Sequence, residues 1–406
     1  EEVLNDIDGS TARSPANTRP ITLSNTDNKV FAAAINHALA GATAQVIGKY
    51  QQGFIRGRSI VHQVLTLDGY AVLWAKYHHK DLAVILFDIV AAFPSLNHKF
   101  IVKSLLHRGL PTQLIEFIRI VYDNVFSSFT VGGAPSLLIW IEAGIKQGCP
   151  LSPLLFVLCY DVLLTYLKAH PGHEDYAFAD DLAIGVDNIP SLIPLLEEIK
   201  EFSAFSGLGL NMDKTCLLST LPTFYSDQAI LGEHGFGSIK FVDKGVYLGV
   251  LLGQDISTID VFAAAKTKLF DRVRKYRPML RRSTLHTRFV IWNVWVLPIM
   301  YYLAQFYIIP YKSTLGPIKE LARRTIVPYN GGGFAYAHLV TPRPGYGPST
   351  PLRDLYSHNL ALMAYSFPLE NSQGMDLPVM GDHLDVTLPG WGSLLIHEHE
   401  AYAAYA

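Results

Sequence analysis

Three aspartates lie at the ends of short β-prone segments, and this placement constrains the fold more than any other feature of the sequence. The apolar run 82–87 leads directly to Asp88. A second region, 176–186, consists of two β-prone runs that meet at Asp180 and Asp181, as in a hairpin with an acidic tip. Because helical patterns separate and follow these segments, the chain should fold as an α+β protein whose sheet presents the acids.

Apolar periodicity predicts further helices and strands around these segments. Several helical patterns follow N-cap residues or stop at a glycine, which are the usual signals for helix ends. The predicted helices begin at 24–27, cover 60–77, start at Ser152 with Pro153 as the first helical residue, cover 191–205 with Gly207 as the end, and continue from Val261 onward. The predicted strands are 208–218 and 245–252.

The composition is that of a folded protein with an ordinary charge balance. Of its 406 residues, 50% are hydrophobic and 17% are charged, and the formal net charge is −2. The chain can therefore bury a large core, but it lacks the strongly basic balance that would announce a nucleic-acid partner. Three widely spaced cysteines suit neither a zinc cluster nor a disulfide framework, which favours a reducing compartment. We expect no secretory signal at the beginning, which resembles a fragment or a processed edge.

Two segments could indicate a membrane span or a metal site. The uncharged segment 289–310 is long enough to cross a membrane. Its Asn293, Pro298 and Gln305, together with several aromatic residues, favour instead a helix packed inside a soluble domain. The alternating His and Glu residues at 397–400 are potential metal ligands, but this pattern is more typical of a solvated terminus.

Seven segments in a fixed order carry a resemblance to a known family. They are 19–23, 53–59, 87–93, 144–153, 178–181, 207–215 and 247–249. In this order they resemble the successive motifs of reverse transcriptases, in particular those of the LINE-type, non-LTR retrotransposon branch. The resemblance implies a right-hand polymerase fold with fingers, an antiparallel-sheet palm and a helical thumb. The implied reaction is RNA-directed DNA synthesis, in which a primer is extended on an RNA template and pyrophosphate is released.

The resemblance also implies a metal site. Asp88, Asp180 and Asp181 would hold two Mg²⁺ ions, which Mn²⁺ can replace, about 3.5 to 4 Å apart. Such a pair activates the primer 3′-hydroxyl and neutralises the departing pyrophosphate. Lys214 matches the motif lysine proposed to protonate the pyrophosphate or to steady its charge. Because an Asp-Asp pair at a turn is usually only solvated, this interpretation depends on the other motifs.

A nucleotide pocket and a primer contact follow from the same resemblance. Phe93 would lie beneath the incoming sugar and leave no room for a 2′-hydroxyl, so that deoxynucleotides are preferred. Gln147 and Gly148 would line the nucleotide and template pocket, where glycine lets the backbone approach closely. The candidates for contact with the triphosphate are Arg58, Arg56 and Lys146, and those for holding the primer end are Tyr247, Leu248 and Gly249.

A basic stretch follows the primer-contact segment. Between 266 and 288 there are nine Lys or Arg residues and a single acid, Asp271. Such a stretch suits sequence-independent contact with the backbone of a duplex, although a solvated helix face has the same pattern. The candidates for duplex binding are Lys268, Arg272, Lys275, Arg281 and Arg282.

The chain departs from the LINE-type pattern at three positions. Ala91 and Pro94 stand where many members have a lysine and an acid, and Arg56 stands where many have proline. We recognise no endonuclease and no cysteine-histidine tail, so target-site cleavage is not predicted.

These assignments divide the chain into four parts. The predicted parts are an N-terminal segment and fingers at 1–87, a palm at 88–254 with a fingers insertion at about 101–140, a helical thumb at 255–330, and a C-terminal extension of unassigned role at 331–406. The expected partners are template RNA, primer DNA and deoxynucleoside triphosphates, without a membrane. Three rival functions remain open: a catalytically inactive RNA-binding scaffold, an RNA-synthesising polymerase and a membrane-associated protein that uses 289–310.

Overall fold

The computed structural model describes most of the chain up to residue 326. The described residues are 3–5, 11–13, 22, 24–78, 83–123, 125–128, 130–131, 134–135, 137–219, 224–253 and 256–326. They belong to two compact units. The first unit comprises 1–60, 83–217 and 223–241, and the second comprises 61–82, 218–222 and 242–406. The predicted C-terminal extension, with the His and Glu residues at 397–400, lies outside the described residues.

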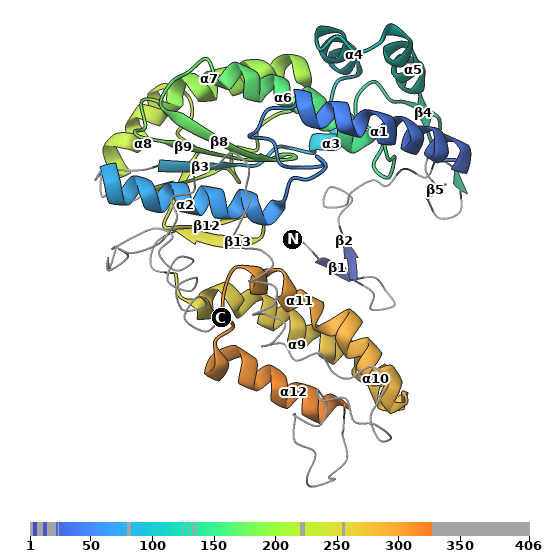
Figure 1. Cartoon of the computed structure of the whole chain (residues 1–406), viewed down its shortest axis with the longest axis vertical. Coiled ribbons are helices and arrows are strands. Elements are labelled where there is room, and N and C mark those ends of the chain that lie inside the picture. Colours follow the sequence, from blue (N-terminus) through green and yellow to red (C-terminus); the bar gives the residue numbers. More distant parts are fainter. Residues whose placement is uncertain are drawn as a thin grey trace. The chain divides into compact units, whose positions relative to one another are not determined.

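A five-stranded sheet forms the centre of the first unit, with the strand order β11–β10–β3–β9–β8. Figure 1 labels its strands β3, β8 and β9. Both β3 and β8 pair antiparallel with β9. All five residues of β3 are buried, because an uninterrupted apolar run suits a central strand that is covered on both faces. The strands are β3 (Ala83–Phe87), β8 (His173–Phe178), β9 (Asp181–Val186), β10 (Cys216–Ser219) and β11 (Lys240–Val242).

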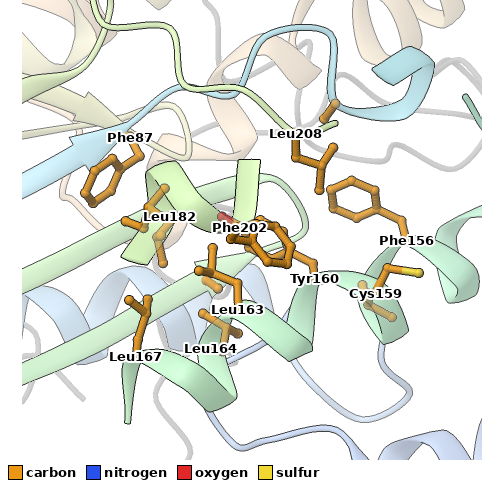
Figure 2. Packing of buried hydrophobic residues seen from close by; sticks show 14 of the residues in the cluster. Phe87, Phe156, Cys159, Tyr160, Leu163, Leu164, Leu167, Leu182, Phe202 and Leu208 are labelled. Carbon is orange, nitrogen blue, oxygen red and sulfur yellow. The ribbon is translucent and has the colours of Figure 1, made fainter. Parts of the chain in front are cut away.

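Two helices of the first unit supply much of its core. Helix α6 (Ser152–Leu167) is apolar on almost every side and is buried along most of its length, as expected of an internal helix. Helix α7 (Leu192–Ser206) packs against α6 and ends at Gly207, whose left-handed φ of 83° confirms the predicted helix end. Figure 2 shows side chains of both helices in one cluster with Phe87 of β3 and Leu182 of β9.

Smaller elements complete the first unit. Helix α4 packs on α5 and α6, and four short strands form two hairpins within the predicted fingers insertion. The helices are α1 (Thr26–Val46), α3 (Ala92–Ser95), α4 (His98–His107), α5 (Thr112–Tyr122) and α8 (Phe224–Glu233). The strands are β1 (Val3–Asn5) paired with β2 (Thr11–Arg13), β4 (Phe126–Ser127) with β7 (Ile139–Trp140), and β5 (Thr130–Val131) with β6 (Ala134–Pro135).

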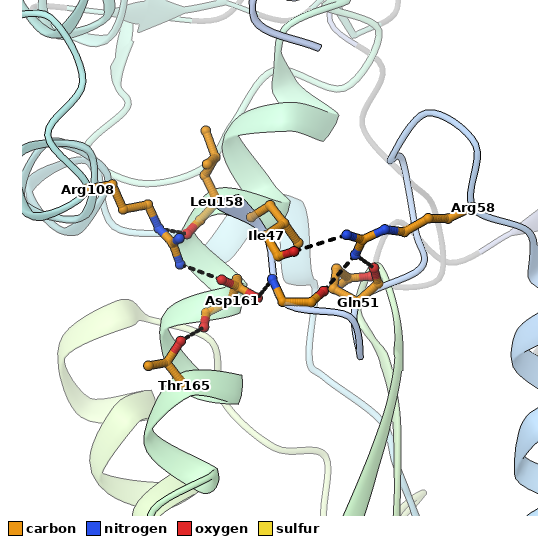
Figure 3. A network of polar contacts seen from close by, with 8 residues as sticks. Ile47, Gln51, Arg58, Arg108, Leu158, Asp161 and Thr165 are labelled. Atoms are coloured by element: carbon orange, nitrogen blue, oxygen red, sulfur yellow. Dashed lines mark hydrogen bonds and ion pairs between the residues drawn. The ribbon is translucent and has the colours of Figure 1, made fainter. Parts of the chain in front are cut away.

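A polar network ties the loop after α1 to α6 (Figure 3). The buried carboxylate of Asp161 accepts hydrogen bonds from Arg108 at 2.8 Å and from the backbone amide of Gly48 at 3.0 Å. The guanidinium of Arg58 donates to the carbonyls of Ile47 and Gly48, at 3.0 and 2.6 Å, and to two more carbonyls nearby. Since carbonyls at a helix end lack partners within the helix, these bonds hold the loop in place.

The second unit combines a hairpin with helices. Helix α9 begins with a capping box between Ser257 and Asp260, and it packs on α11 and α12. The elements are α2 (Ile60–His78), β12 (Lys244–Tyr247), β13 (Val250–Gly253), α9 (Thr258–Arg282), α10 (Leu285–Ile291), the π-helical turn η2 (Trp292–Val296), α11 (Pro298–Tyr301), the 3₁₀ turn η3 (Leu303–Gln305), the π-helical turn η4 (Tyr311–Leu315) and α12 (Gly316–Ile326).

The prediction of one helix over 289–310 is wrong. The segment contains the end of α10, then η2, α11 and η3, and it has no regular structure from Ile308. Within η2 the amide of Leu297 bonds to the carbonyl of Trp292, and Pro298, which lacks an amide hydrogen, starts the next helix. Among the residues that the structure describes, no helix is both long and apolar enough to cross a membrane.

Candidate active site

The three predicted metal-binding acids lie at the same end of two neighbouring strands. In the antiparallel pair β3–β9 the last paired residues are Phe87 and Leu182, and Asp88 follows Phe87 while Asp181 precedes Leu182. Directly opposite residues lie roughly 5 Å apart at Cα and point to the same face of the sheet. Ala179 and Asp180 form the two-residue turn that joins β8 to β9, and Asp181 is the first residue of β9. Strand pairing therefore explains how acids that are distant in the sequence come to the same end of neighbouring strands.

The donor chemistry of these acids suits a magnesium ion. Asp88 and Asp180 are half-buried and Asp181 is exposed. Within the described ranges, no three His, Cys, Asp or Glu side chains gather closely enough to hold a metal by themselves. Mg²⁺ in nucleotide-processing sites usually takes one or two carboxylates and completes its shell with water and substrate phosphates. A carboxylate set of this kind therefore fits the ion without forming a protein cage.

The loop 209–215 packs on the backbone of Asp88. The amide of Asn211 donates to the carbonyl of Asp88 at 2.8 Å, and the hydroxyl of Thr215 lies 3.5 Å from the amide of Asp88. The carbonyl of Asn211 accepts from the amide of Lys214 at 3.2 Å, which closes a turn. The prediction of a continuous strand over 208–218 is therefore wrong, and β10 begins only after this turn. Lys214 is exposed, and it lies on the segment that is bonded to Asp88.

The turn before the acidic pair is held by a residue that the sequence did not single out. Gln51 is fully buried, and its side-chain amide bonds to both the amide and the carbonyl of Ala179, at 2.8 and 3.1 Å. Its position two residues before the 53–59 motif was visible in the sequence. Nothing in the local pattern distinguished Gln51 from its neighbour Gln52, because the contact joins residues far apart in the chain.

Phe93 lies in an aromatic stack. Its ring is parallel to that of Phe156, with centroids 5.0 Å apart, and it meets the edge of Phe54 at 6.3 Å. Its carbonyl accepts from the amide of Ile145 at 2.8 Å, which joins it to the 144–153 motif. The half-buried ring is thus held by its neighbours, and its contact with a sugar stays a prediction.

The 144–153 motif supplies three more nucleotide-pocket candidates. The ammonium of Lys146 lies 5.7 Å from the centre of the Tyr122 ring, a cation–π distance. The carbonyl of Gln147 accepts from the amide of Thr22 at 3.0 Å. Gly148 is exposed and has a φ of 97°, a left-handed conformation that glycine adopts without strain. The role of Gly148 in a nucleotide pocket stays a prediction.

The two candidate arginines differ in their surroundings. The guanidinium of Arg58 donates to four backbone carbonyls at the end of α1 and in the loop after it. Burial lowers the pKa of Arg58, while Asp161 opposes that shift. Contact with a triphosphate stays a prediction for Arg58, and it would require giving up some of these bonds. Arg56 is exposed at an open cavity of about 280 Å³, which Phe54 and Thr43 also line. The side chain of Arg56 therefore lies beside an open space.

The profile of one protein family covers most of the residues just described. The family described as reverse transcriptase (RNA-dependent DNA polymerase) matches residues 9–252. The chain belongs to the reverse transcriptase family. This membership confirms the resemblance drawn from the ordered motifs, and with it the right-hand polymerase fold.

Relatives of this reverse transcriptase include several retrotransposon proteins. It is 28% identical over 261 residues to the Retrovirus-related Pol polyprotein from type-2 retrotransposable element R2DM of Drosophila melanogaster, covering 59% of this chain and 24% of the relative. It is 29% identical over 215 residues to the corresponding polyprotein from type-1 element R2 of Popillia japonica, covering 50% and 30%. The RNA-directed DNA polymerase from mobile element jockey of Drosophila funebris is 23% identical over 305 residues, covering 71% and 32%. The match spans about a quarter to a third of these relatives.

Solved structures of telomerase are also similar. The telomerase from Candida albicans in complex with the TWJ fragment of telomeric RNA has a TM-score of 0.47 and 12% identity, covering 84% of this chain and 52% of that one.

The primer-contact candidates of the reverse transcriptase lie in its second unit. Leu248 and Gly249 form the turn between β12 and β13, with φ values of 48° and 80°. Tyr247 is buried, and its hydroxyl accepts from the amide of Gln63 at 3.4 Å. The hydroxyl of Tyr302 donates to the carbonyl of Leu248 at 2.5 Å. The predicted tight hairpin is therefore present, while its contact with a primer stays a prediction.

The five duplex-binding candidates of the reverse transcriptase are all exposed on α9. Among the other basic residues of the stretch, Lys266 donates to the carbonyl of Ser313 at 2.6 Å, and Arg288 donates to that of Ile326 at 3.0 Å. These two side chains tie α9 and α10 to neighbouring elements. Of the five, Arg272 also donates to the carbonyl of Trp295 at 2.7 Å, which gives it a structural contact as well.

Proposed function

We propose that this reverse transcriptase extends a primer with deoxynucleotides on an RNA template. The observation that carries the proposal is the β3–β9 pairing, which ends at Phe87 and Leu182 directly beside Asp88 and Asp181, with Asp180 in the adjoining turn. Family membership supports the reaction type. The proposed partners are template RNA, primer DNA and deoxynucleoside triphosphates.

Asp88, Asp180 and Asp181 would hold two divalent ions, Mg²⁺ or Mn²⁺. When bound, these ions supply activation of the primer 3′-hydroxyl and charge neutralisation on the departing pyrophosphate. Lys214, on the loop bonded to Asp88, would give the pyrophosphate a proton or a compensating charge. An exposed ammonium suits this role because it is not committed to a buried partner in the folded core.

The nucleotide pocket would use the stacked ring of Phe93 to exclude a 2′-hydroxyl. Gln147 and Gly148 would line the pocket, with Arg56, Lys146 and Arg58 as triphosphate contacts of decreasing structural support. Arg58 comes last because its guanidinium already serves four carbonyls.

The second unit would hold the nucleic acid. Tyr247, Leu248 and Gly249 would place the primer end, mainly through the exposed turn, because the side chain of Tyr247 is buried. The exposed basic residues of α9 would contact the duplex backbone. In this proposal the palm covers 88–254 and the thumb 255–330, with the fingers formed by 1–87 and the insertion at about 101–140.

Primer extension on an RNA template with Mg²⁺ tests the proposal. Wild-type protein should incorporate deoxynucleotides, and Asp180→Asn should reduce incorporation below detection. Asp187→Asn, which changes a carboxylate just beyond the other end of β9, is the matched control and should keep activity. Template binding without extension would favour the RNA-binding scaffold, and preferential use of ribonucleotides would favour the RNA-synthesising polymerase.

Phe93→Ala tests the sugar selection. Removing the ring should increase ribonucleotide incorporation relative to deoxynucleotide incorporation, measured in competition. Phe205→Ala, which removes a partly exposed aromatic ring from α7, is the control. Unchanged selection in Phe93→Ala would remove this residue from the role.

Combined substitution of Lys268, Lys275 and Arg282 by alanine tests the duplex contact. Each lost phosphate contact should flatten the slope of log affinity against log salt by about 1. A variant with Lys99→Ala and Lys103→Ala, exposed lysines of α4, should keep the wild-type slope. An unaltered slope in the α9 variant would place the duplex elsewhere.

A further inference from the structure

The side chain of Gln51 is fully buried, and it makes three hydrogen bonds to backbone groups. Its Oε1 accepts from the amides of Ala179 and Gly53, each at 2.8 Å, and its Nε2 donates to the carbonyl of Ala179 at 3.1 Å. Both backbone polar groups of Ala179 are therefore paired with one side chain. Because the carbonyl of Ala179 belongs to the peptide that leads into Asp180, these bonds set the plane from which the Asp180 side chain departs.

Ala179 has a backbone that needs external support. Its φ is +57°, in the left-handed region, where a residue with a Cβ clashes with its own chain. Residues other than glycine persist there when the surrounding structure determines their conformation. Ala179 is 5% exposed, so water cannot readily replace the bonds from Gln51. The conformation of this turn thus depends on the buried amide.

The loop that carries Gln51 is itself firmly placed against β8. The amide of Gln52 donates to the carbonyl of Ala177 at 2.8 Å, and the amide of Ala177 donates to the carbonyl of Tyr50 at 3.1 Å. A Cβ on Gly53 would lie 2.2 Å from the nitrogen of Ala179, so the loop and the turn are in direct contact. The carbonyl of Gln51 is one of the four that Arg58 binds (Figure 3). The side-chain amide of Gln51 is therefore carried by a loop that several contacts hold in place.

We propose that Gln51 is a positioning residue for Asp180, which it holds in the orientation that the metal-dependent reaction requires. This inference rests on the proposed function of the site. Side chains that orient metal-holding groups without touching the metal typically change metal affinity or activity about 10- to 100-fold when they are replaced. Gln51 meets that description because two of its three side-chain hydrogen bonds go to the backbone that leads into Asp180.

Gln51→Met is the informative variant, and Gln52→Met is its matched control. Methionine has nearly the length of glutamine but offers neither the amide donor nor the carbonyl acceptor. Gln52 lies in the same loop and is 8% exposed. Its side-chain amide donates to the carbonyl of Lys49 at 2.8 Å and not to the Ala179–Asp180 turn. Each variant thus removes one buried side-chain amide, but only Gln51→Met removes the hydrogen bonds to Ala179.

Primer extension over a range of Mg²⁺ concentrations gives the first readout. In Gln51→Met, kcat should fall about 10- to 100-fold and half-saturation should need more Mg²⁺, while the KM for primer–template stays unchanged. Gln52→Met should behave as wild type. Equal behaviour of the two variants, or a change confined to the KM for primer–template, would overturn the inference. Should Gln51→Met fail to fold, Gln51→Asn, whose amide is drawn back by one methylene, should shift the Mg²⁺ requirement in the same direction.

Mn²⁺ binding, followed by electron paramagnetic resonance without primer or nucleotide, gives a readout that does not need activity. Weaker Mn²⁺ binding in Gln51→Met than in Gln52→Met would support the positioning role. If Gln51→Met binds Mn²⁺ more weakly but the wild-type protein extends no primer, the proposed function is wrong while the positioning role of Gln51 stands. Equal Mn²⁺ affinities in the two variants would overturn the positioning role, whatever the extension assay shows.

Discussion

The turn at Ala179–Asp180 and the turn at Leu248–Gly249 both join antiparallel strands with two residues, but they are stabilised differently. In the hairpin of the second unit both residues have positive φ, at 48° and 80°, and one of them is glycine. Such a turn matches the natural twist of its strands. In the turn of the first unit Ala179 has a φ of +57°, and there is no glycine.

The difference shows which turn depends on distant residues. The Leu248–Gly249 turn receives one hydrogen bond from Tyr302 to the carbonyl of Leu248. Ala179 receives two from Gln51, which lies 128 residues earlier in the sequence. A turn that local residues can form by themselves is insensitive to its surroundings, whereas the acid-bearing turn takes its shape from the core beneath it.

The largest expected effect is that of Gly53→Ala. The added Cβ would lie 2.2 Å from the nitrogen of Ala179 and within 3 Å of two further backbone atoms, which cannot rotate away. The free energy of unfolding should fall by about 3 kcal/mol, and extension should be lost with it. Thermal unfolding and primer extension measure the two effects.

Gly41→Ala is the control for this substitution. Gly41 lies within α1, and a Cβ there meets nothing within 4 Å. Because alanine favours a helix over glycine, this change should stabilise the protein by about 0.5–1 kcal/mol. Similar melting temperatures for the two variants would show that the loop and the acid-bearing turn are not in close contact.

An intermediate effect is expected from Gly249→Ala. The residue has a φ of 80°, so the Cβ should cost about 1 kcal/mol, and it would also approach the ring of Tyr302 to 3.3 Å. Gly249→Asn should cost less, because asparagine tolerates the left-handed region better than alanine. Thermal unfolding compares the two. An equal loss in both would mean that crowding against Tyr302, and not backbone strain, decides the effect.

Tyr302→Phe should have the smallest effect. It removes the hydroxyl that donates to the carbonyl of Leu248 but leaves the φ values of the turn compatible with a hairpin. A single hydrogen bond contributes about 0.5–1.5 kcal/mol, and the half-buried carbonyl can turn to water, so the loss should lie near the lower end. A loss greater than that of Gly249→Ala, measured by thermal unfolding, would contradict the idea that this hairpin forms mainly from local residues.

Much of the fold could be predicted because its signals are local. The predicted helix at 60–77 corresponds closely to α2, and the predicted end at Gly207 is correct. Predictions failed where a distant or special contact took over from periodicity. In 208–218 the carbonyl of Asn211 closes a turn against Asp88, and in 289–310 a π-helical turn and Pro298 divide the helix.

The sequence by itself determined the strands that end at Asp88 and meet at Asp180 and Asp181, and the family, because apolar spacing and ordered motifs are written within short stretches of chain. Only the tertiary structure decided that β3 pairs with β9 up to the residues beside Asp88 and Asp181, that Arg58 caps α1 and that Gln51 holds Ala179. These contacts join residues that are far apart along the chain, or they depend on where a side chain points, which no local pattern specifies. Their physical basis is the pairing of polar groups that burial removes from water.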